Sequence, residues 1–265
     1  MTLRLSAGPA FDAAASRDAA PTIFPDKTSQ VWRLPADLLA ALDRAAAAAV
    51  RWDFESEAEL LHLAQLAVLL KSRGLRVTLE LPYLPYARQD KDIDNAATFA
   101  LHAFAKLLNA LELDAVRVLD AHSAKAGALI QKLEDRAPRA EIQGALNATG
   151  ADLILFPDAG AKARYGAYGL AESIHAEKDR DQATGLIKGI VIHGAVKGRR
   201  VLIVDDICDG GMTFKLVAER ALAGGAAEVH LFTTHGIFSK GVATLRASGI
   251  RRVFTHLGEI PQEAA

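Results

Sequence analysis

The stretch VLIVDDICDGGMT, residues 201–213, places two adjacent carboxylates and a glycine loop at the end of an apolar run. The β-forming residues before Asp205 and Asp206 predict a buried strand, and ligands of open α/β sheets bind beyond the carboxyl ends of strands. The loop leads to a predicted helix start near Met212, and backbone N–H groups at a helix N-terminus bind anions. The stretch therefore predicts an anion site that is bordered by carboxylates.

A ribose phosphate would satisfy both halves of this site. Its phosphate would lie on the loop N–H groups and the Thr213 hydroxyl, and its ring hydroxyls would donate to the carboxylates. A divalent cation, which prefers oxygen ligands, can add to this arrangement. Without hydroxyls or a cation, the carboxylates would repel the anion. The residues predicted to hold the sugar phosphate are Asp205, Asp206, Asp209, Gly210, Gly211, Met212 and Thr213.

A second stretch, LPYLPYARQDK at residues 81–91, presents cationic side chains on a turn after a predicted strand. Arg88 and Lys91 can hold a polyphosphate, and Gln89 can hydrogen-bond to the edge of a base or sugar. This stretch closely resembles the signature P-Y-x-x-Y-A-R-Q-D-[KR] of the ribose-phosphate diphosphokinase (PRPP synthetase) family. The 201–213 stretch resembles the phosphoribosyl-diphosphate loop of that family and of type I phosphoribosyltransferases, which lack the second motif because they do not bind ATP.

Five further segments are similar to motifs of the same family: FPDKTSQVW at 24–32, LDAH at 119–122, FPDAGAKAR at 156–164, EKDR at 177–180 and THGIFSKG at 234–241. The resemblance implies that His122 ligates a metal in the ATP site and that Asp158 binds metal and ribose. It also implies that Lys178 and Arg180 are the catalytic residues, which neutralise the transferring phosphates from a mobile hairpin.

The resemblance implies one reaction, in which the diphosphoryl group of MgATP moves to the anomeric hydroxyl of ribose 5-phosphate and gives phosphoribosyl diphosphate and AMP. Mg²⁺ is the implied cofactor, and the implied chemistry is positioning with charge neutralisation. The implied ATP-binding residues are Phe24, Asp26, Arg88, Gln89, Asp90, Lys91 and His122. Phe24 and Asp26 would come from a neighbouring subunit, so a homo-oligomer with a shared ATP site is expected.

Some positions depart from the family pattern. Gly210 stands where the family's loop has a threonine, and Met212 stands where it has a glycine. Thr28 replaces the glutamate of the family's F-x-D-G-E segment, which bears on adenine recognition. Three other functions therefore stay open: a diphosphokinase for a larger ribose 5-phosphate derivative such as ADP-ribose, a plain phosphoribosyltransferase, and a non-catalytic regulatory subunit of a PRPP synthetase.

Short β-rich runs alternate with helical stretches, which predicts mostly parallel sheets flanked by helices. The predicted strands are 48–53, 75–82, 115–120, 151–157, 186–193, 200–205, 227–233 and 251–255. The predicted helices are 57–72, 96–111 and 212–223, with a capping box at Ser56 and Glu59, and the alanine run 45–49 is predicted to be helical.

A charged and glycine-containing segment at 131–150 predicts the boundary between two α/β halves. By resemblance these are two tandem phosphoribosyltransferase-like domains. Residues 1–140 would carry the ATP-site motif, and residues 141–265 would carry the ribose 5-phosphate loop.

Composition narrows the class of protein. The chain has 265 residues and a net charge of −1, so nothing in it favours nucleic acid or an anionic membrane as a partner. Cys208 is the single cysteine, which excludes an internal disulfide and favours a reducing compartment. Residues 1–20 lack the apolar core of a signal peptide, and the longest apolar runs are too short to span a bilayer. A cytoplasmic globular protein is expected.

Overall fold

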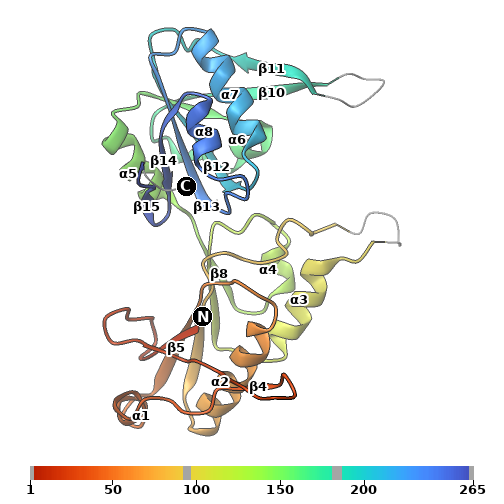
Figure 1. The fold of residues 1–265 in the computed structure, drawn as a ribbon, viewed down its shortest axis with the longest axis vertical. Coiled ribbons are helices and arrows are strands. Elements are labelled where there is room, and N and C mark those ends of the chain that lie inside the picture. The colour runs from red at the N-terminus through yellow and green to blue at the C-terminus, as the bar shows by residue number, and fades with distance from the viewer. Residues whose placement is uncertain (1–2, 92–96, 181–186, 263–265) are drawn as a thin grey trace. The chain divides into compact units, whose positions relative to one another are not determined.

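The computed structural model describes residues 3–91, 97–180 and 187–262. The chain divides into two compact units, Met1–Ala137 and Pro138–Ala265. Each unit is a mostly parallel sheet flanked by helices (Figure 1), and this confirms the predicted fold class. No helix in the described part of the chain combines the length and the apolar character needed to span a bilayer.

Unit 1 is built on a six-stranded sheet with the order β2-β1-β5-β6-β7-β8. Strands β5 to β8 pair in parallel, and β1 and β2 add an antiparallel edge. The strands of this sheet are β1 (Leu3–Ala7), β2 (Arg17–Asp18), β5 (Ala47–Trp52), β6 (Arg76–Glu80), β7 (Ala115–Leu119) and β8 (Leu133–Arg136). The helices are α1 (Ala36–Leu42), α2 (Glu59–Ser72), α3 (Ala100–Asn109) and α4 (Ala126–Leu129), and a separate hairpin pairs β3 (Thr22–Ile23) with β4 (Ser29–Gln30).

The alanine run 45–49 was predicted to be helical, and that prediction is wrong. Helix α1 ends at Leu42, and Ala47, Ala48 and Ala49 open strand β5. These alanines are at most 4% exposed and lie between β1 and β6. The helix propensity of alanine exceeds that of other ordinary residues by no more than about 0.7 kcal/mol per residue. Burial and hydrogen bonding to strands on both sides therefore decide the conformation.

Unit 2 is built on a seven-stranded sheet with the order β11-β10-β9-β12-β13-β14-β15. Its inner strands are parallel, and the edge strands β11 and β15 are antiparallel. The strands are β9 (Leu153–Phe156), β10 (Glu172–Arg180), β11 (Ile187–His193), β12 (Arg200–Cys208), β13 (Glu228–Gly236), β14 (Ile250–Thr255) and β15 (Gly258–Glu259). The helices are α5 (Arg139–Thr149), α6 (Ala159–Tyr165), α7 (Met212–Ala223) and α8 (Ala243–Ala247), with a 3₁₀ turn η1 (Gly166–Tyr168).

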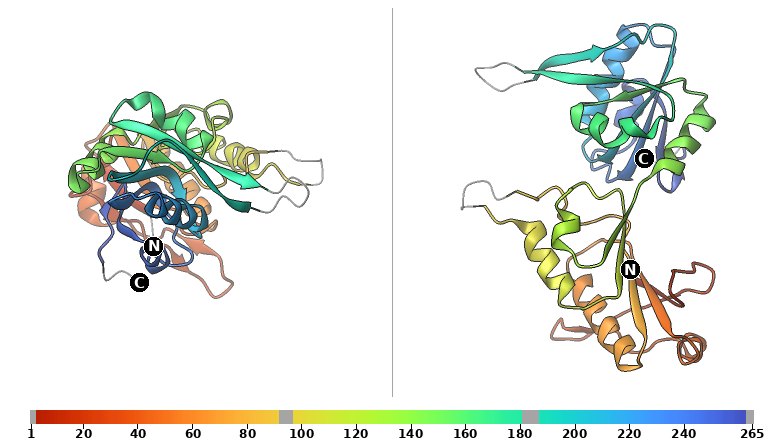
Figure 2. Two further views of the ribbon diagram at one scale, coloured as in Figure 1. Left: turned by 90° about the horizontal axis from the view of Figure 1, so that it is seen from above. Right: turned by 180° about the vertical axis from the view of Figure 1, so that it is seen from behind.

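Helices cover both faces of the unit 2 sheet (Figure 2). Helices α5 and α6 pack with Ile154, Leu202 and Val204 on one face. Helices α7 and α8 pack on the opposite face, where β12 contributes Val201 and Ile203. This alternation along β12 follows from the two-residue repeat of a strand. The sheet is therefore doubly wound, with two separate layers of core.

The strand order places a topological switch point between β9 and β12. Strand β9 is followed by β10 on one side, whereas the chain returns to β12 on the other side of β9. The connection through α6 lies on one face and the connection through α7 lies on the other. In open α/β sheets, ligands bind in the crevice at such a point, beyond the carboxyl ends of the strands.

Strands β1, β8 and β10 and the two-residue strands β2, β3, β4 and β15 were not predicted. Strand β8 and helix α5 occupy the segment 131–150 that was predicted as a boundary. Strand β8 reads LEDR and is mostly exposed, so it carries no apolar alternation. Strand β10 reads ESIHAEKDR, and of its residues only Ile174 and Ala176 pack into the apolar core. Polar strands of this kind lack the pattern on which strand prediction depends.

The start of α2 is fixed by a buried carboxylate. Glu59 Oε2 accepts hydrogen bonds from the backbone N–H groups of Glu55 and Ser56 and from Trp52 Nε1, at 2.9 to 3.1 Å. Its bond to Ser56 N is the glutamate half of the predicted capping box. The helix begins at Glu59 and its N-cap position is Ala58, which makes no side-chain cap, so the serine half was wrong.

We expect Glu59→Ala to destabilise unit 1 by about 2–3 kcal/mol, because it leaves the buried indole N–H of Trp52 without its acceptor. Denaturant unfolding followed by tryptophan fluorescence measures this change. Glu112→Ala is the matched control, since Glu112 is 84% exposed and pairs only at 3.5 Å with Lys71. It should change stability by less than about 0.5 kcal/mol. Equal effects of the two substitutions would contradict the role assigned to Glu59.

Candidate functional site

Three carboxylates gather at the switch point of unit 2. Asp158 directly follows β9 and Pro157, and Asp205 and Asp206 lie within the carboxyl-terminal part of β12. Asp206 continues the alternation of Leu202 and Val204, so its side chain lies on the α6 face. There it is 5% exposed and forms an ion pair with Arg164 of α6.

The two adjacent aspartates were predicted to emerge at the strand edge, and this detail is wrong. Strand β12 continues to Cys208, with Asp205 paired to Thr233 and Cys208 paired to Gly236 of β13. Asp205 Oδ1 accepts a hydrogen bond from the backbone N–H of Asp206 at 2.9 Å. Both carboxylates are therefore held inside the sheet, and their positions are fixed by the strand itself.

Crowding and burial change the ionisation of this cluster. Burial, the charge of Asp206 and the charge of Asp158 together raise the pKa of Asp205 to about 8, against the smaller opposing effects of the Asp206 N–H and Arg164. Burial and the nearby Asp205 and Asp209 carboxylates raise the pKa of the Cys208 thiol to about 12, so this thiol stays protonated near neutral pH. The cluster therefore favours a cation or hydroxyl donors, and Cys208 is not a nucleophile there.

The residues after β12 form a tight loop that ends in the N-terminus of α7. Gly211 is the N-cap residue, with φ of 74°, and no side chain caps the helix. A Cβ at Gly211 would lie 2.7 Å from Leu245 Cδ2, so both the backbone and the space require glycine. The first N–H groups of α7 have no intrahelical partners, and they form the anion-binding end of this helix.

Gly210 has a different environment. A Cβ built there would lie 3.7 Å from Lys240 Cγ, which is an ordinary van der Waals distance. The position therefore has room for a side chain. Met212, the first residue of α7, is 61% exposed, and Thr213 lies next to it in the first helical turn. Asp209 is half-buried between the strand and this loop.

The THGIFSKG segment packs against the same loop. The carbonyl of Cys208 accepts hydrogen bonds from the N–H groups of Ile237 and Phe238 at 2.8 and 3.1 Å. This contact brings Lys240 beside Gly210. Lys240 and Arg164 lie in the family-like segments 234–241 and 156–164, but neither of them was predicted to have a role in the site. For Arg164, the ion pair with Asp206 supplies that role.

In unit 1, the structure brings two of the predicted motifs together. The 81–91 motif follows β6 and the LDAH motif ends β7, and these strands are neighbours in the sheet. Asp90 Oδ2 accepts a hydrogen bond from Ser123 Oγ at 2.7 Å, and Lys125 Nζ donates to the backbone carbonyl of Asp90 at 2.7 Å. The half-buried His122 directly precedes Ser123.

The remaining members of the 81–91 motif lie on the surface of this loop. Arg88, Gln89 and Lys91 are exposed, and the Gln89 N–H donates to the Tyr86 carbonyl at 2.9 Å. Tyr86 adopts φ of 63° and donates to Glu57, and burial together with this bond raises the pKa of Tyr86 to about 12. The turn therefore presents its polar side chains outward while Tyr86 anchors it.

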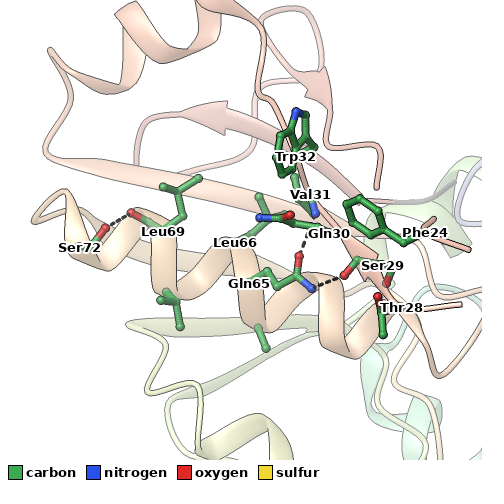
Figure 3. A pocket seen from close by; sticks show the side chains of 12 residues that line it. Phe24, Thr28, Ser29, Gln30, Val31, Trp32, Gln65, Leu66, Leu69 and Ser72 are labelled. Carbon is green, nitrogen blue, oxygen red and sulfur yellow. Dashed lines mark hydrogen bonds between the residues drawn. The ribbon is translucent and has the colours of Figure 1, made fainter. Parts of the chain in front are cut away.

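Phe24 and Asp26 lie elsewhere in unit 1, on the β3–β4 hairpin. Asp26 accepts hydrogen bonds from the hydroxyl and the N–H of Thr28, and these bonds lower its pKa. The hairpin and α2 border a groove of about 840 Å³, in which Phe24 and Trp32 flank the entrance and Gln65 joins the two elements (Figure 3). Thr28 thus stabilises the hairpin turn at the position of the family's glutamate.

Lys178 and Arg180 lie in the carboxyl-terminal part of β10, opposite Ile190 and Ile187 of β11. No strand was predicted between residues 157 and 186, whereas β10 extends to Arg180. Their side chains, and residues 181–186, lie outside what the structure describes.

The carboxylates of unit 2 suit a magnesium ion. Mg²⁺ and Ca²⁺ take hard oxygen ligands, and Asp158, Asp205 and Asp206 supply them from two adjacent strand ends. Asp158 Oδ1 caps α6 by accepting from Ala161 N at 3.0 Å, which fixes the orientation of the carboxylate. Burial and the neighbouring carboxylates together raise the pKa of Asp205, and a bound cation would relieve the repulsion among these carboxylates.

Comparison with known proteins shows what the sequence and the fold resemble. The phosphoribosyl transferase domain family matches residues 167–256, which include the glycine loop and α7. A solved phosphoribosylpyrophosphate synthetase from Mycobacterium smegmatis superposes with a TM-score of 0.63 at 22% identity, over 79% of this chain and 76% of that chain. The likeness shows a shared fold, with two sheet-and-helix units.

Sequence comparison finds proteins that are similar to about two thirds of the chain. The ribose-phosphate pyrophosphokinase of Maricaulis maris is 32% identical over 193 residues, which are 68% of this chain and 61% of that protein. The one from Pyrococcus furiosus is 33% identical over 180 residues, which are 65% of this chain and 63% of that protein. These matches confirm the predicted resemblance: about two thirds of the chain is similar to ribose-phosphate pyrophosphokinases, and the chain spans about 60% of the length of these two proteins.

The pKa of Asp205 gives a prediction for the metal-free protein. The pKa of Asp205 is higher in the folded state than its ordinary value of 3.8. The contribution of Asp205 to the free energy of unfolding is therefore largest below pH 3.8 and is lost as the pH rises to about 8. We expect Asp205→Asn, which keeps the acceptor for Asp206 N–H, to be more stable than the unmodified chain. The gain should grow between pH 5 and 8, by at most about 1.4 kcal/mol per pH unit.

Thermal unfolding in the presence of a chelator measures this difference. Asp37→Asn is the control of opposite sign, because hydrogen bonding to Arg17 lowers the pKa of Asp37. That exposed group favours the folded state above its unfolded pKa and loses this contribution as pH falls through the folded value. Its substitution should give no gain at pH 8. A stability difference for Asp205→Asn that is constant from pH 5 to 8 would contradict the buried, crowded carboxylate.

Proposed function

We propose that the chain transfers the diphosphoryl group of MgATP to the anomeric hydroxyl of a ribose 5-phosphate acceptor, giving AMP and a phosphoribosyl diphosphate. The observation that carries this proposal is the convergence of Asp158, Asp205 and Asp206 with the N-terminus of α7 at one switch point. Carboxylates beside an anion-binding helix end suit a ligand that has both a phosphate and hydroxyl groups. The sequence relationship to ribose-phosphate pyrophosphokinases supports the same assignment.

The chain's own groups have separable roles in this reaction. Asp205 and Asp206 accept the ribose hydroxyls, and the N–H groups at the start of α7 hold the 5-phosphate with Thr213. Arg164 orients the Asp206 carboxylate by pairing with it. Mg²⁺, when bound by Asp158 and its neighbours, supplies charge neutralisation for the phosphates. Lys178 and Arg180 are assigned to the transferring phosphates through the family motif.

The ATP side of the proposal rests on unit 1. Arg88, Gln89 and Lys91 are exposed on the turn that Asp90 ties to the 122–125 loop, where they can contact a polyphosphate. His122 lies beside this tie as the proposed metal ligand. Phe24 and Asp26 are assigned to the ATP site of a neighbouring copy.

Exposed apolar surface on the same hairpin and on α2 supports a homo-oligomer. Ile23, Trp32 and Val68 are 64%, 56% and 70% exposed, and this surface borders the groove of Figure 3. Large apolar residues that cluster on a surface are typical of an interface between proteins. We assign this surface to contact with a second copy of the chain.

The proposed function is tested by a product assay. The chain is incubated with MgATP and either ribose 5-phosphate or ADP-ribose, and AMP and the diphosphorylated sugar are measured by ³¹P NMR. Formation of AMP only in the presence of an acceptor supports the proposal. No turnover with any acceptor would contradict it and favour a non-catalytic regulatory subunit. ATP-independent consumption of phosphoribosyl diphosphate with a base would favour a phosphoribosyltransferase.

We expect Asp206→Asn to lower kcat/KM for the acceptor about tenfold or more. The amide keeps the shape but loses the charge that accepts from ribose hydroxyls, and a charge-assisted hydrogen bond contributes roughly 1.5–3 kcal/mol. Asp152→Asn is the matched control, because Asp152 forms its ion pair with Arg199 at the other end of β9. A kcat/KM for the acceptor that stays within twofold of the unmodified chain in Asp206→Asn would contradict the assignment of Asp206 to the ribose hydroxyls.

The glycine loop predicts how acceptor preference can be changed. Gly210 offers no hydroxyl to the 5-phosphate, and Met212 is exposed where the family has glycine. Because a Cβ fits at Gly210, the double change Gly210→Thr with Met212→Gly can be made without a steric clash at residue 210. We expect it to raise kcat/KM for ribose 5-phosphate relative to ADP-ribose. An unchanged ratio of the two kcat/KM values would contradict a role of these positions in acceptor choice.

A further inference from the structure

A histidine pair and a glutamate form a second cluster in unit 2, outside the residues assigned above. His175 of β10 lies directly opposite His193 of β11 in the antiparallel register. Glu177 follows two residues after His175, so all three side chains share one face of the two strands. The opposite face carries Ile174 and Ile192, which pack into the core beneath α7. The cluster therefore lies on the face toward α6, whose Lys162 contacts His175. Strands β10 and β11 form a hairpin that extends from the body of unit 2 (Figures 1 and 2).

The distances within the cluster are close to those between ligands of one metal ion. Glu177 Oε1 lies 3.6 Å from His175 Nε2, and Glu177 Oε2 lies 3.3 Å from His193 Nε2. One ligand atom of each residue lies within 4.8 Å of those of the other two. Metal–ligand bonds of about 2.0–2.1 Å in a tetrahedron separate neighbouring ligand atoms by about 3.3–3.4 Å. The imidazole rings are stacked, 4.9 Å apart and inclined by 24°, so both can turn Nε2 toward the carboxylate.

The donor set decides the kind of metal. Two imidazoles and one carboxylate suit Zn²⁺ and similar borderline divalent ions, whereas Mg²⁺ prefers oxygen ligands throughout. Side-chain exposures of 19% for His175, 45% for His193 and 58% for Glu177 leave the outer side open to solvent. We propose that His175, Glu177 and His193 form a site for Zn²⁺ or a related transition metal, with water in the fourth position.

Lys162 of α6 limits the affinity of this site. Its Nζ lies 3.4 Å from His175 Nδ1, which places a positive charge beside one ligand. In the metal-free chain, His175 Nδ1 accepts from Lys162, so the proton of the neutral ring lies on Nε2, 3.6 Å from Glu177 Oε1. Metal binding at Nε2 moves that proton to Nδ1, which then can no longer accept from Lys162, and it adds a second positive charge near the ammonium group. Removing the ammonium group should therefore strengthen metal binding.

The metal would join two strands that are otherwise linked by backbone hydrogen bonds. Two ligands come from β10 and one from β11, so the bound ion cross-links the edge of the sheet. Strand β10 continues from Glu177 to Lys178 and Arg180. An ion at this place would hold the register of the strand that carries both residues, and it would raise the stability of unit 2 by binding only the folded state.

Titration calorimetry with Zn²⁺ tests the proposal on the full chain without an affinity tag. Excess Mg²⁺ is kept present, so that the carboxylates of the switch point are occupied by their own ion. We expect one Zn²⁺ per chain, with affinity reduced at least about tenfold in His193→Ala and in Glu177→Gln. The controls are His102→Ala and Glu172→Gln. His102 is an exposed histidine of α3, and Glu172 lies on the same strand as Glu177 and forms an ion pair with Arg199. Both controls should bind as the unmodified chain does.

Two further measurements separate a metal site from a hydrogen-bonded cluster. Lys162→Met keeps the aliphatic stem and should bind Zn²⁺ more tightly, and Co²⁺ should give the visible absorption of a tetrahedral site that His193→Ala abolishes. Failure of Zn²⁺ to bind would overturn the proposal. Binding that is equally strong in His193→Ala and Glu177→Gln would also overturn it. None of these readouts depends on enzymatic activity, so their outcome is independent of the proposed function.

Discussion

The repulsion among three carboxylates at the ends of β9 and β12 is the constraint on which the site depends. Asp158, Asp205 and Asp206 are brought together by strand order, and their partial or complete burial limits the screening of their charges by water. The Arg164 ion pair and the backbone N–H groups that donate to Asp158 and Asp205 offset part of the repulsion among the carboxylates. Burial and the remaining repulsion together raise the pKa of Asp205 to about 8. A cluster held under such repulsion is arranged for a ligand that brings hydroxyl donors or a cation.

The glycine loop follows from the same constraint. A phosphate can lie near carboxylates only if strong donors hold it at a fixed place, and the unpartnered N–H groups of α7 are such donors. Gly211 allows the chain to turn from β12 into α7 while Leu245 packs close beneath it. The 234–241 segment closes the loop from the neighbouring strand by hydrogen-bonding to the Cys208 carbonyl. Negative and anion-binding groups are thus separated within one short stretch of sequence.

Much of this arrangement could be predicted from the sequence, because it lies in apolar strands and glycine-marked turns. The predicted helix 212–223 matches α7, and the strand before it was found through its run of β-forming residues. The alanines of β5 and the polar strands β8 and β10 were not predicted, since burial in a sheet and edge pairing are tertiary effects that local patterns do not record. The pairing of Arg164 with Asp206, 42 residues apart, depends on the strand order and had no local signal. The same holds for His175 and His193, which only the register of β10 and β11 brings together.

A crystal structure of the chain with ribose 5-phosphate and Mg²⁺ would test the central claim most directly. The account predicts the 5-phosphate on the backbone N–H groups of residues 210–213 and the ring hydroxyls on Asp205 and Asp206. It also predicts the cation within reach of the carboxylates at the switch point. A sugar phosphate bound elsewhere in the chain, with the start of α7 and both aspartates free of ligand, would contradict it.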